Sequence, residues 1–553
     1  MQNLRIIPLG GMGNVTQNMY LYEYDQEILI VDCGIGFPDI YMPGVDTLIP
    51  DISYLLKQLE AGKKIVGMVL SHGHDDHIGA LPYILPELPD FPIYASPLTA
   101  GFAEQRISDR SVEKKINVLK DRVPVTIGTA FKIMTIAMTH SVPDTKHIII
   151  DTPEGVVYHG SDFKLDPSPV DGVLPDFAAV EQLGRQGIML MMVDSLRIER
   201  PEPVASESSV GPVLEALMAR TAGKFVVTLM SSHIHRIQQL IKSAEKFHRK
   251  VVLVGRSVEQ NVKVSRELEK LIIPQDILVD KKYIQDYKDS QLCVIVAGSQ
   301  GQEGSSLVRA VFGEHRDLQL AIRDMVVFSA DVIPGNEIPY YRAVDELART
   351  GIEVIYPDIV PGVHQSGHAS AAEQMRLVKM VQPKYVMPIG GADRHRALFR
   401  KKVEAELSFP ADKVLTPAKG EVISFSHQTV SIAETIAINA RAVDGLGVGD
   451  VGPIVLADRL SLAQAGMVVV VIPRQNGELD LRNLNIISRG FVFMKQADEV
   501  INFVKDKTIE IINQLEPGIK DEDFKRTIER RLARRLYKII QREPVIVATI
   551  LDL

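Results

Sequence analysis

The stretch Ser71-His72-Gly73-His74-Asp75-Asp76-His77 decides how the rest of this sequence is interpreted. It directly follows the apolar run KIVGMVL at 64–70, which is typical of a buried strand, and α/β folds place their chemistry at the polar ends of such strands. His72 and His74 stand two positions apart on an extended loop, so their imidazoles can point toward one position. Asp76 and His77 follow where the chain turns into a helix-like segment. The motif therefore predicts ligands for two adjacent metal ions.

Length and composition limit the possible classes of protein. The chain has 553 residues, enough for about three or four domains, and its 46% hydrophobic and 24% charged residues are ordinary for a globular protein. Two cysteines, Cys33 and Cys293, cannot build a disulfide framework or a thiolate zinc site, so any metal must be held by His, Asp or Glu. No apolar run approaches the roughly 18 residues of a membrane span and the N-terminus lacks a signal-peptide pattern, so we expect a cytoplasmic protein without membrane contact. A net charge of −8 argues against nucleic-acid binding over the whole surface but leaves a local basic groove open.

The pattern of predicted strands and helices changes along the chain. Short apolar runs that end in Gly, Asp or His fill the first 200 residues, whereas strand-like and helix-like segments alternate from about Glu207 and predict a second domain with a parallel sheet. Beyond Gly362 the pattern of strands followed by polar loops resembles that of the first region again, which indicates that the middle segment is an insertion. We expect a first domain at 1–206 and 361–430, an inserted domain at 207–360, a Gly- and Asp-rich linker at 431–455 and a C-terminal domain at 456–553.

The last predicted helix carries two different faces. Phe524, Ile528, Leu532 and Leu536 recur at four-residue spacing and predict an apolar face that packs on a core. Basic residues occupy the opposite face, namely Arg526, Arg530, Arg531, Arg534 and Lys538. A solvated charged face and a contact with RNA both remain open.

Two more strand ends offer metal ligands. His140 in IAMTHSVPD and Asp162 in YHGSDFKLD both follow strand-like runs, and they fit the roles of a further ligand and of a carboxylate that bridges two ions. Taken alone, a His or Asp at a strand end is more often a turn or cap residue. Asp32, at the end of EILIVD, is a candidate for orienting a metal-bound imidazole from behind.

Many motifs of this chain resemble one known family. They are PLGGMGN, GFPDIYMPGVDTLIPDISYL, SHGHDDHIGALPY, THSVPDT, SDFKLDPSPVDG, SSHIHRIQQ, AGSQGQ, IPGNE, HQSGHAS, PKYVMPI and ISRGFVF. Together they resemble the RNase J family, the β-CASP nucleases of the metallo-β-lactamase superfamily, almost end to end. The resemblance implies an α/β fold: an αββα metallo-β-lactamase sandwich, an inserted α/β β-CASP domain over the catalytic face, and a small α/β C-terminal domain that supports dimerisation.

The resemblance also implies roles for particular residues. His72, His74 and His140 correspond to ligands of one zinc ion, Asp76 and His77 to those of a second, and Asp162 to the bridge. Mn²⁺ or Mg²⁺ could replace zinc. Asp194 corresponds to the first β-CASP acidic motif and His368 to a histidine that contacts the scissile phosphate, and with Asp76 they form the implied catalytic set.

Phosphate recognition has its own segments. Ser366-Gly367-His368 precedes a helix-like stretch, so backbone N–H groups and the helix dipole can hold a phosphate oxygen, and Gly367 allows close approach. The resemblance adds His364 and Gln365 to this site. It also places Ser299, Gln300, Gly335 and Asn336 around the 5′ end of the RNA.

One departure from the family concerns the second metal. The family has a ligand histidine where this chain reads Pro388-Ile389-Gly390-Gly391-Ala392, so Gly390 cannot coordinate through a side chain. Loss of one ligand should weaken the second site, unless Asp393 or His395 replaces it. Smaller departures include Asn14, Ser161, Leu196, His233 and Gln302.

The function that the resemblance implies is a zinc-dependent ribonuclease of RNA maturation and decay. It would act as a 5′-3′ exonuclease and as an endonuclease, use a metal-bound hydroxide, leave 5′ phosphates, prefer RNA with a 5′ monophosphate, and form a homodimer or homotetramer or assemble with a paralogous subunit. Because Gly390 replaces a ligand, a weakly active or inactive paralogue that binds RNA as a scaffold is the alternative. Thioester or lactone hydrolysis would share the His72 to His77 motif, but it needs no insertion of about 150 residues with phosphate-type turns.

Overall fold

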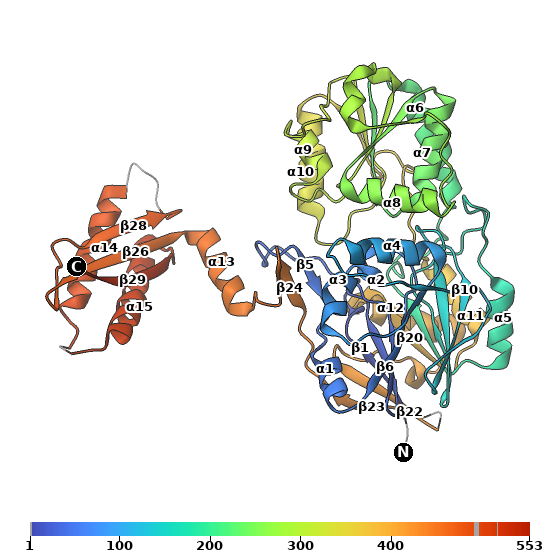
Figure 1. The fold of residues 1–553 in the computed structure, drawn as a ribbon, viewed down its shortest axis with the longest axis horizontal. Helices are drawn as coiled ribbons and strands as arrows, with labels where there is room; N and C mark the ends of the chain where they lie inside the picture. The colour runs from blue at the N-terminus through green and yellow to red at the C-terminus, as the bar shows by residue number, and fades with distance from the viewer. Residues whose placement is uncertain (1–2, 428, 492–496, 517) are drawn as a thin grey trace. The chain divides into compact units, whose positions relative to one another are not determined.

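The computed structural model describes residues 3–427, 429–491, 497–516 and 518–553. These fall into two compact units, Met1–Phe37 with Leu48–Ala440, and Pro38–Thr47 with Arg441–Leu553. The first unit contains the predicted sandwich together with the predicted insertion (Figure 1).

Two sheets face each other in the sandwich. The first, in spatial order, consists of β23 (Thr429–Thr435), β22 (Glu421–Ser426), β1 (Leu4–Pro8), β3 (Tyr20–Tyr24), β4 (Glu27–Val31), β6 (Lys64–Val69), β7 (Ile93–Ala95) and β8 (Asn117–Val118). The second consists of β20 (Tyr385–Ile389), β13 (Leu190–Asp194), β12 (Gly155–His159), β11 (Lys146–Thr152), β10 (Phe131–Ala137) and β9 (Val125–Ile127). Fully buried side chains from both sheets, such as Leu29 and Ile150, share one core. Such burial of apolar surface is the main driving force for stacking two sheets.

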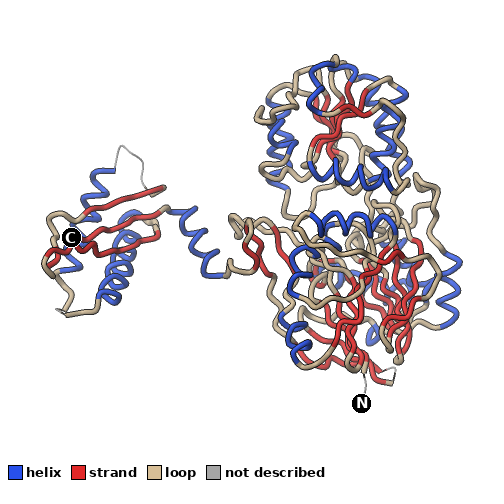
Figure 2. Tube along the Cα trace, in the orientation of Figure 1, coloured by secondary structure: helices blue, strands red, loops and turns tan. Residues whose placement is uncertain are grey.

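Helices cover the outer faces of the sheets (Figure 2). The outer helices of the second sheet are α5 (Phe177–Gln186), α11 (Ala371–Val381) and α12 (Asp393–Leu407), and their apolar stripes form a second core with β13 and β20. The N-terminal half contributes α1 (Ser53–Glu60), α2 (Asp75–Ile78), α3 (Leu81–Ile84) and α4 (Pro97–Ser108). The predicted αββα order is confirmed.

The inserted segment forms a parallel sheet, as the sequence predicts. Its strands, in spatial order, are β16 (Leu278–Val279), β15 (Lys250–Val254), β17 (Leu292–Val296), β14 (Phe225–Thr228), β18 (Met325–Phe328) and β19 (Glu353–Ile355). Around it lie α6 (Val210–Arg220), α7 (Ile234–Lys246), α8 (Arg256–Glu267), α9 (Ser306–Val311) and α10 (Glu337–Arg349). Continuous apolar runs such as LCVIV are buried on both faces, which is typical of a parallel sheet covered by helices.

The C-terminal unit is a small α/β module. Its sheet contains β27 (Glu478–Leu479), β26 (Met467–Gln475), β28 (Asn485–Arg489) and β29 (Val545–Asp552), and its helices are α13 (Pro453–Ala465), α14 (Ala497–Ile512) and α15 (Asp521–Ile540). The apolar face of α15 packs in one core with strand residues such as Val470, as predicted. Both interpretations of its basic face, a solvated surface and a contact with RNA, stay open. None of the helices that the structure describes has the length and apolar composition needed to cross a bilayer.

The stretch 431–455, expected as a linker, holds short elements. It contains the end of β23, a hairpin of β24 (Arg441–Asp444) and β25 (Gly447–Val448), and the start of α13. The two compact units divide inside this stretch, at Ala440. Gly445 takes a φ of 57° in the hairpin turn, so glycine here marks a tight turn between strands.

Candidate metal centre and substrate cleft

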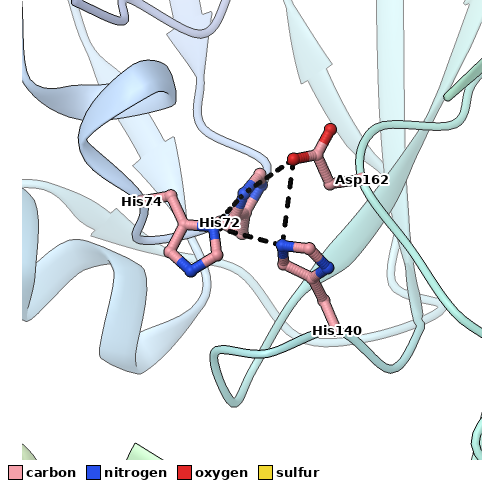
Figure 3. A group of neighbouring side chains, drawn as sticks. All are labelled: His72, His74, His140 and Asp162. Atoms are coloured by element: carbon pink, nitrogen blue, oxygen red, sulfur yellow. Dashed lines mark hydrogen bonds and ion pairs between the residues drawn. The ribbon is translucent and has the colours of Figure 1, made fainter. Parts of the chain in front are cut away.

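Side chains from three strand ends of the sandwich meet at one position. His72 and His74 follow β6, His140 follows β10, and Asp162 follows β12. Figure 3 shows these four side chains pointing toward one another. The buried strands fix the loops that carry them, so residues up to 90 positions apart in sequence become neighbours.

The four side chains present their ligand atoms in a metal-competent arrangement. Nδ1 of His74 lies 3.2 Å from Nε2 of His72 and 3.1 Å from Nε2 of His140. Oδ2 of Asp162 lies 3.7 Å from Nε2 of His72 and 3.8 Å from Nε2 of His140. Ligands about 2.0–2.1 Å from a tetrahedral zinc stand roughly 3.4 Å apart, so these separations fit such an ion.

The opposite nitrogens of the three imidazoles are held from behind. Nδ1 of His140 donates to the Gly367 carbonyl at 2.6 Å, and Nδ1 of His72 and Nε2 of His74 lie 3.0 Å from the hydroxyls of Ser71 and Ser141. The lone pairs of the remaining nitrogens therefore converge, an arrangement that a cation between them stabilises. Burial lowers the pKa of His72 and His140 well below the ordinary value and that of His74 to about 3, so the rings are neutral, as metal ligands must be.

A second group shares Asp162. Nε2 of His77 lies 3.5 Å from Oδ2 of Asp162 and 3.6 Å from Oδ2 of Asp76. Nδ1 of His77 lies 2.7 Å from Asp32, which also accepts from the hydroxyl of Ser71, so Asp32 orients the ring as we expected. Burial acts to lower the pKa of His77, but the surrounding carboxylates outweigh it and raise that pKa. Asp162 thus belongs to both of these groups, and to a third with Asp194 and His368, and each group could hold a metal ion.

His368 and Asp194 lie next to this centre. Nδ1 of His368 donates to Oδ2 of Asp194 at 2.8 Å, and its Nε2 lies 3.8 Å from Asp162. Burial acts to lower the pKa of His368, but the carboxylates of Asp194 and Asp162 outweigh it and raise that pKa to about 9. Asp194 is itself fixed by the backbone N–H of Leu196 at 2.8 Å. The pair can hold and transfer a proton beside the candidate metals.

Gly390 leaves room for a side chain beside Asp194 and Asp162. A Cβ atom built on Gly390 would lie 3.5 Å from Asp194 and 3.7 Å from Asp162, and no atom is nearer. Asp393 instead pairs with Arg396 at 3.1 Å, and Nε2 of His395 lies 3.7 Å from Glu199. Neither joins the metal-competent groups found among the described residues.

A large cleft opens in front of these groups. Its volume is about 950 Å³, and it is lined by the sandwich and by loops at the carboxyl ends of strands in the inserted domain. Of the residues predicted to bind substrate, Ser299, Gln300, His364, Ser366, Gly367 and His368 line it. Gln365, Gly335 and Asn336 lie outside the lining. The Gln365 carbonyl accepts from a buried arginine, the Gly335 N–H donates to Glu337, and Asn336 directly precedes α10 without a capping hydrogen bond from its side chain.

That buried arginine, Arg236, was missed from the sequence. Its guanidinium is fully buried and donates to both carboxylate oxygens of Glu207 at 2.9 and 2.6 Å. It also donates to Nδ1 of His364 at 2.6 Å and to the Gln365 carbonyl at 3.2 Å. Arg236 thereby ties the inserted domain to the loop that ends at His368. The only sequence signal was its place four residues before the buried Leu240 on α7.

The fold and the site together define a class of protein. An αββα sandwich with histidine and aspartate ligands at its strand ends, interrupted by a parallel α/β domain that walls a cleft, is a metallo-β-lactamase-type metallohydrolase with a β-CASP insertion. Family models agree: "Metallo-beta-lactamase superfamily" matches 12–189, "Ribonuclease J, beta-CASP domain" 222–347, "Zn-dependent metallo-hydrolase RNA specificity domain" 351–416 and "Ribonuclease J C-terminal domain" 454–553.

The chain belongs to the ribonuclease J family. It is 35% identical to Ribonuclease J of Thermus thermophilus, over all of this chain and 95% of the relative. It is 30% identical to Ribonuclease J2 of Bacillus subtilis, over all of this chain and 99% of the relative. A solved structure of a protein of unknown function from Enterococcus faecalis shares the fold, with a TM-score of 0.52 at 15% identity over 76% of this chain and all of that one. The domain boundaries that we expected stay a prediction.

Proposed function

We propose that this protein is a metal-dependent ribonuclease that hydrolyses phosphodiester bonds from a 5′-monophosphorylated end and also internally, and leaves 5′ phosphates. Membership of the ribonuclease J family supports a metal-dependent ribonuclease, and it does not favour an inactive scaffold. The observation that carries the proposal is the position of Asp162 between two metal-competent groups at the floor of a cleft walled by the β-CASP domain.

The residues suit a pair of ions, for which zinc is our proposal. His72, His74 and His140 would hold the first ion and Asp76 with His77 the second, and Asp162 would bridge them. Bound metal would supply Lewis-acid activation of water and charge stabilisation at the phosphate. Because Gly390 offers no side chain, we propose that the second position binds more weakly.

The remaining side chains position the phosphate and the proton. Water oxygen forms the new bond to phosphorus, the bond from phosphorus to the 3′ oxygen breaks, and the 3′ oxygen leaves as a hydroxyl. Asp194 orients His368 through Nδ1, which leaves Nε2 to deliver that proton. Ser366 and Gly367 line the cleft directly before His368, where their backbone can approach a phosphate oxygen.

Recognition of the RNA 5′ end is proposed for the β-CASP wall. Ser299 and Gln300 line the cleft there, and Gln300 is held by the Asp331 carbonyl at 2.9 Å. Gly335 and Asn336 begin the adjacent turn and are proposed to contribute by backbone placement. Assembly as a homodimer or homotetramer, or with a paralogous subunit, and a cytoplasmic location are also proposals.

Cleavage of end-defined RNA tests the function. A 3′-labelled RNA of 30 nucleotides carrying a 5′ monophosphate, hydroxyl or triphosphate would be incubated with protein plus Zn²⁺, Mn²⁺ or EDTA. We expect metal-dependent release of 5′-mononucleotides, fastest from the monophosphate. His74→Ala serves as the inactive control. If wild type and His74→Ala leave all three RNAs intact while both bind them, the enzyme assignment fails.

A further inference from the structure

The inserted domain contains a second hollow, separate from the metal-competent groups. Its volume is about 340 Å³, which suits a mononucleotide-sized ligand. We call it the basic pocket, after the five lining residues Arg256, Lys281, Arg309, His315 and Arg316. They come from the start of α8, from the segment after β16, from α9 and from the loop that follows α9.

The basic pocket has more cationic side chains than carboxylates to pair with them. The side chain of Arg256 makes no ion pair or hydrogen bond in the described part of the chain, and that of Arg309 donates only to the Glu314 carbonyl at 3.4 Å. Lys281 pairs with Glu259 at 2.5 Å, and Arg316 with Asp317 at 2.9 Å. Two of the four cations therefore lack a carboxylate, although the chain as a whole carries a net charge of −8. Such uncompensated charge in a hollow favours an anionic ligand.

His315 supplies a hydrogen-bond donor to the basic pocket. It is 7% exposed, and its Nδ1 accepts from the backbone N–H groups of Asp317 and Leu318 at 3.2 and 3.1 Å. The ring proton must then be on Nε2, which has no hydrogen-bond partner among the described residues and belongs to a ring that lines the pocket. Burial, and after it the charge of Arg309, lower the pKa of His315, so the neutral form predominates. The Nε2–H of His315 is therefore available to donate to an anion in the pocket.

The basic pocket adjoins the main cleft. Gly255, Arg256 and Ser306 line both. At this shared edge Gly255 has a φ of 118° and packs closely against Ala297, since an added Cβ would lie 2.6 Å from Cβ of Ala297. The two hollows therefore lie side by side, and a strand that leaves the cleft at this edge would pass the cations of the pocket.

We propose that the basic pocket binds the phosphate group of a nucleotide, presented either by the RNA strand that occupies the cleft or by a free mononucleotide. The first source rests on the proposed function, and the second does not. Bidentate arginine contacts and the Nε2–H of His315 would hold the phosphate oxygens.

The test removes charge from the pocket without touching the cleft. Arg309→Gln combined with Arg316→Gln changes two exposed side chains that line only the basic pocket. The matched control is Arg323→Gln combined with Arg342→Gln, which removes equal charge from exposed positions of the same domain outside both hollows. Uridine 5′-monophosphate is titrated calorimetrically into metal-free protein. A 3′-fluorescein RNA of 20 nucleotides is titrated by anisotropy in the His74→Ala background at several salt concentrations.

We expect the pocket variant, and not the control, to bind at least one probe about tenfold more weakly, because the variant cannot form the charge-assisted hydrogen bonds to phosphate. If RNA is the source, the slope of log affinity against log salt falls by about 0.7 for each phosphate that the variant no longer binds. If only the mononucleotide weakens, the free nucleotide is the source. If the pocket variant and the control bind both probes equally well, the proposal that the basic pocket binds phosphate is wrong. Weaker probe binding by the variant, together with absence of RNA cleavage by wild type, would instead retain the pocket and reject the proposed function.

Discussion

Replacement of Gly390 by histidine offers a quantitative test of the second metal position. The site has room, because an added Cβ would have no neighbour nearer than 3.5 Å. The backbone is less favourable, since Gly390 has a φ of 63°. Left-handed backbone costs a residue with a side chain roughly 1–2 kcal/mol, and histidine tolerates it better than most. The metal-free variant should therefore be slightly less stable than wild type.

Metal binding should reverse this loss. A further imidazole that raises affinity tenfold is worth about 1.4 kcal/mol at saturating metal, which roughly equals the backbone strain. We expect wild type to retain closer to one tightly held metal ion per chain after dialysis, and Gly390→His to retain closer to two. On adding Zn²⁺, the unfolding free energy of Gly390→His should rise by more than that of wild type. The difference should be about 1.4 kcal/mol for each tenfold increase in metal affinity.

The assay combines metal analysis by mass spectrometry with urea unfolding in EDTA and in Zn²⁺. Gly390→Ala is the matched control, because it carries the same backbone strain and offers no ligand. Two tightly held ions in wild type, with no increase in Gly390→His, would refute the reasoning and show that another group completes the site.

Three further predictions concern separate parts of the site. His74→Ala should lower metal retention and cut the cleavage rate by more than about 100-fold, because even groups behind metal ligands contribute 10–100-fold; retention of wild-type metal would contradict its place in the first group. Asp194→Asn should lower kcat by about 10²–10⁴-fold, with little change for RNA whose scissile 3′ oxygen is sulfur, because a thiolate leaves without the proton from His368; equal losses on both substrates would exclude proton delivery. Glu207→Gln should destabilise the metal-free protein by about 3–5 kcal/mol at pH 7, because Arg236 is left buried and unpaired. Burial acts to raise the pKa of Glu207, but the charge of Arg236 outweighs it and lowers that pKa. The ion pair therefore stabilises wild type fully above pH ~4.5, and this stabilisation is lost as the pH falls through the lowered pKa. Urea unfolding from pH 3 to 7 should show this loss in wild type and a flatter profile in Glu207→Gln.

The sequence by itself determined the strands and most of the predicted ligands. Apolar runs such as KIVGMVL and LCVIV are buried strands because their periodicity leaves no polar face, and the neighbours His72 and His74 converge because they share one short loop. The missing histidine at Gly390 was also visible, since it needs only comparison with a motif.

Only the tertiary structure decided which distant groups meet. The family resemblance singles out Asp162 as the bridge, but sequence spacing does not bring it to the histidines; the register of β10, β11 and β12 carries its loop there. The same holds for Arg236, whose burial depends on Glu207 and on the loop at His364. Local periodicity determines which face of an element is apolar, whereas contacts between elements depend on packing across the whole chain.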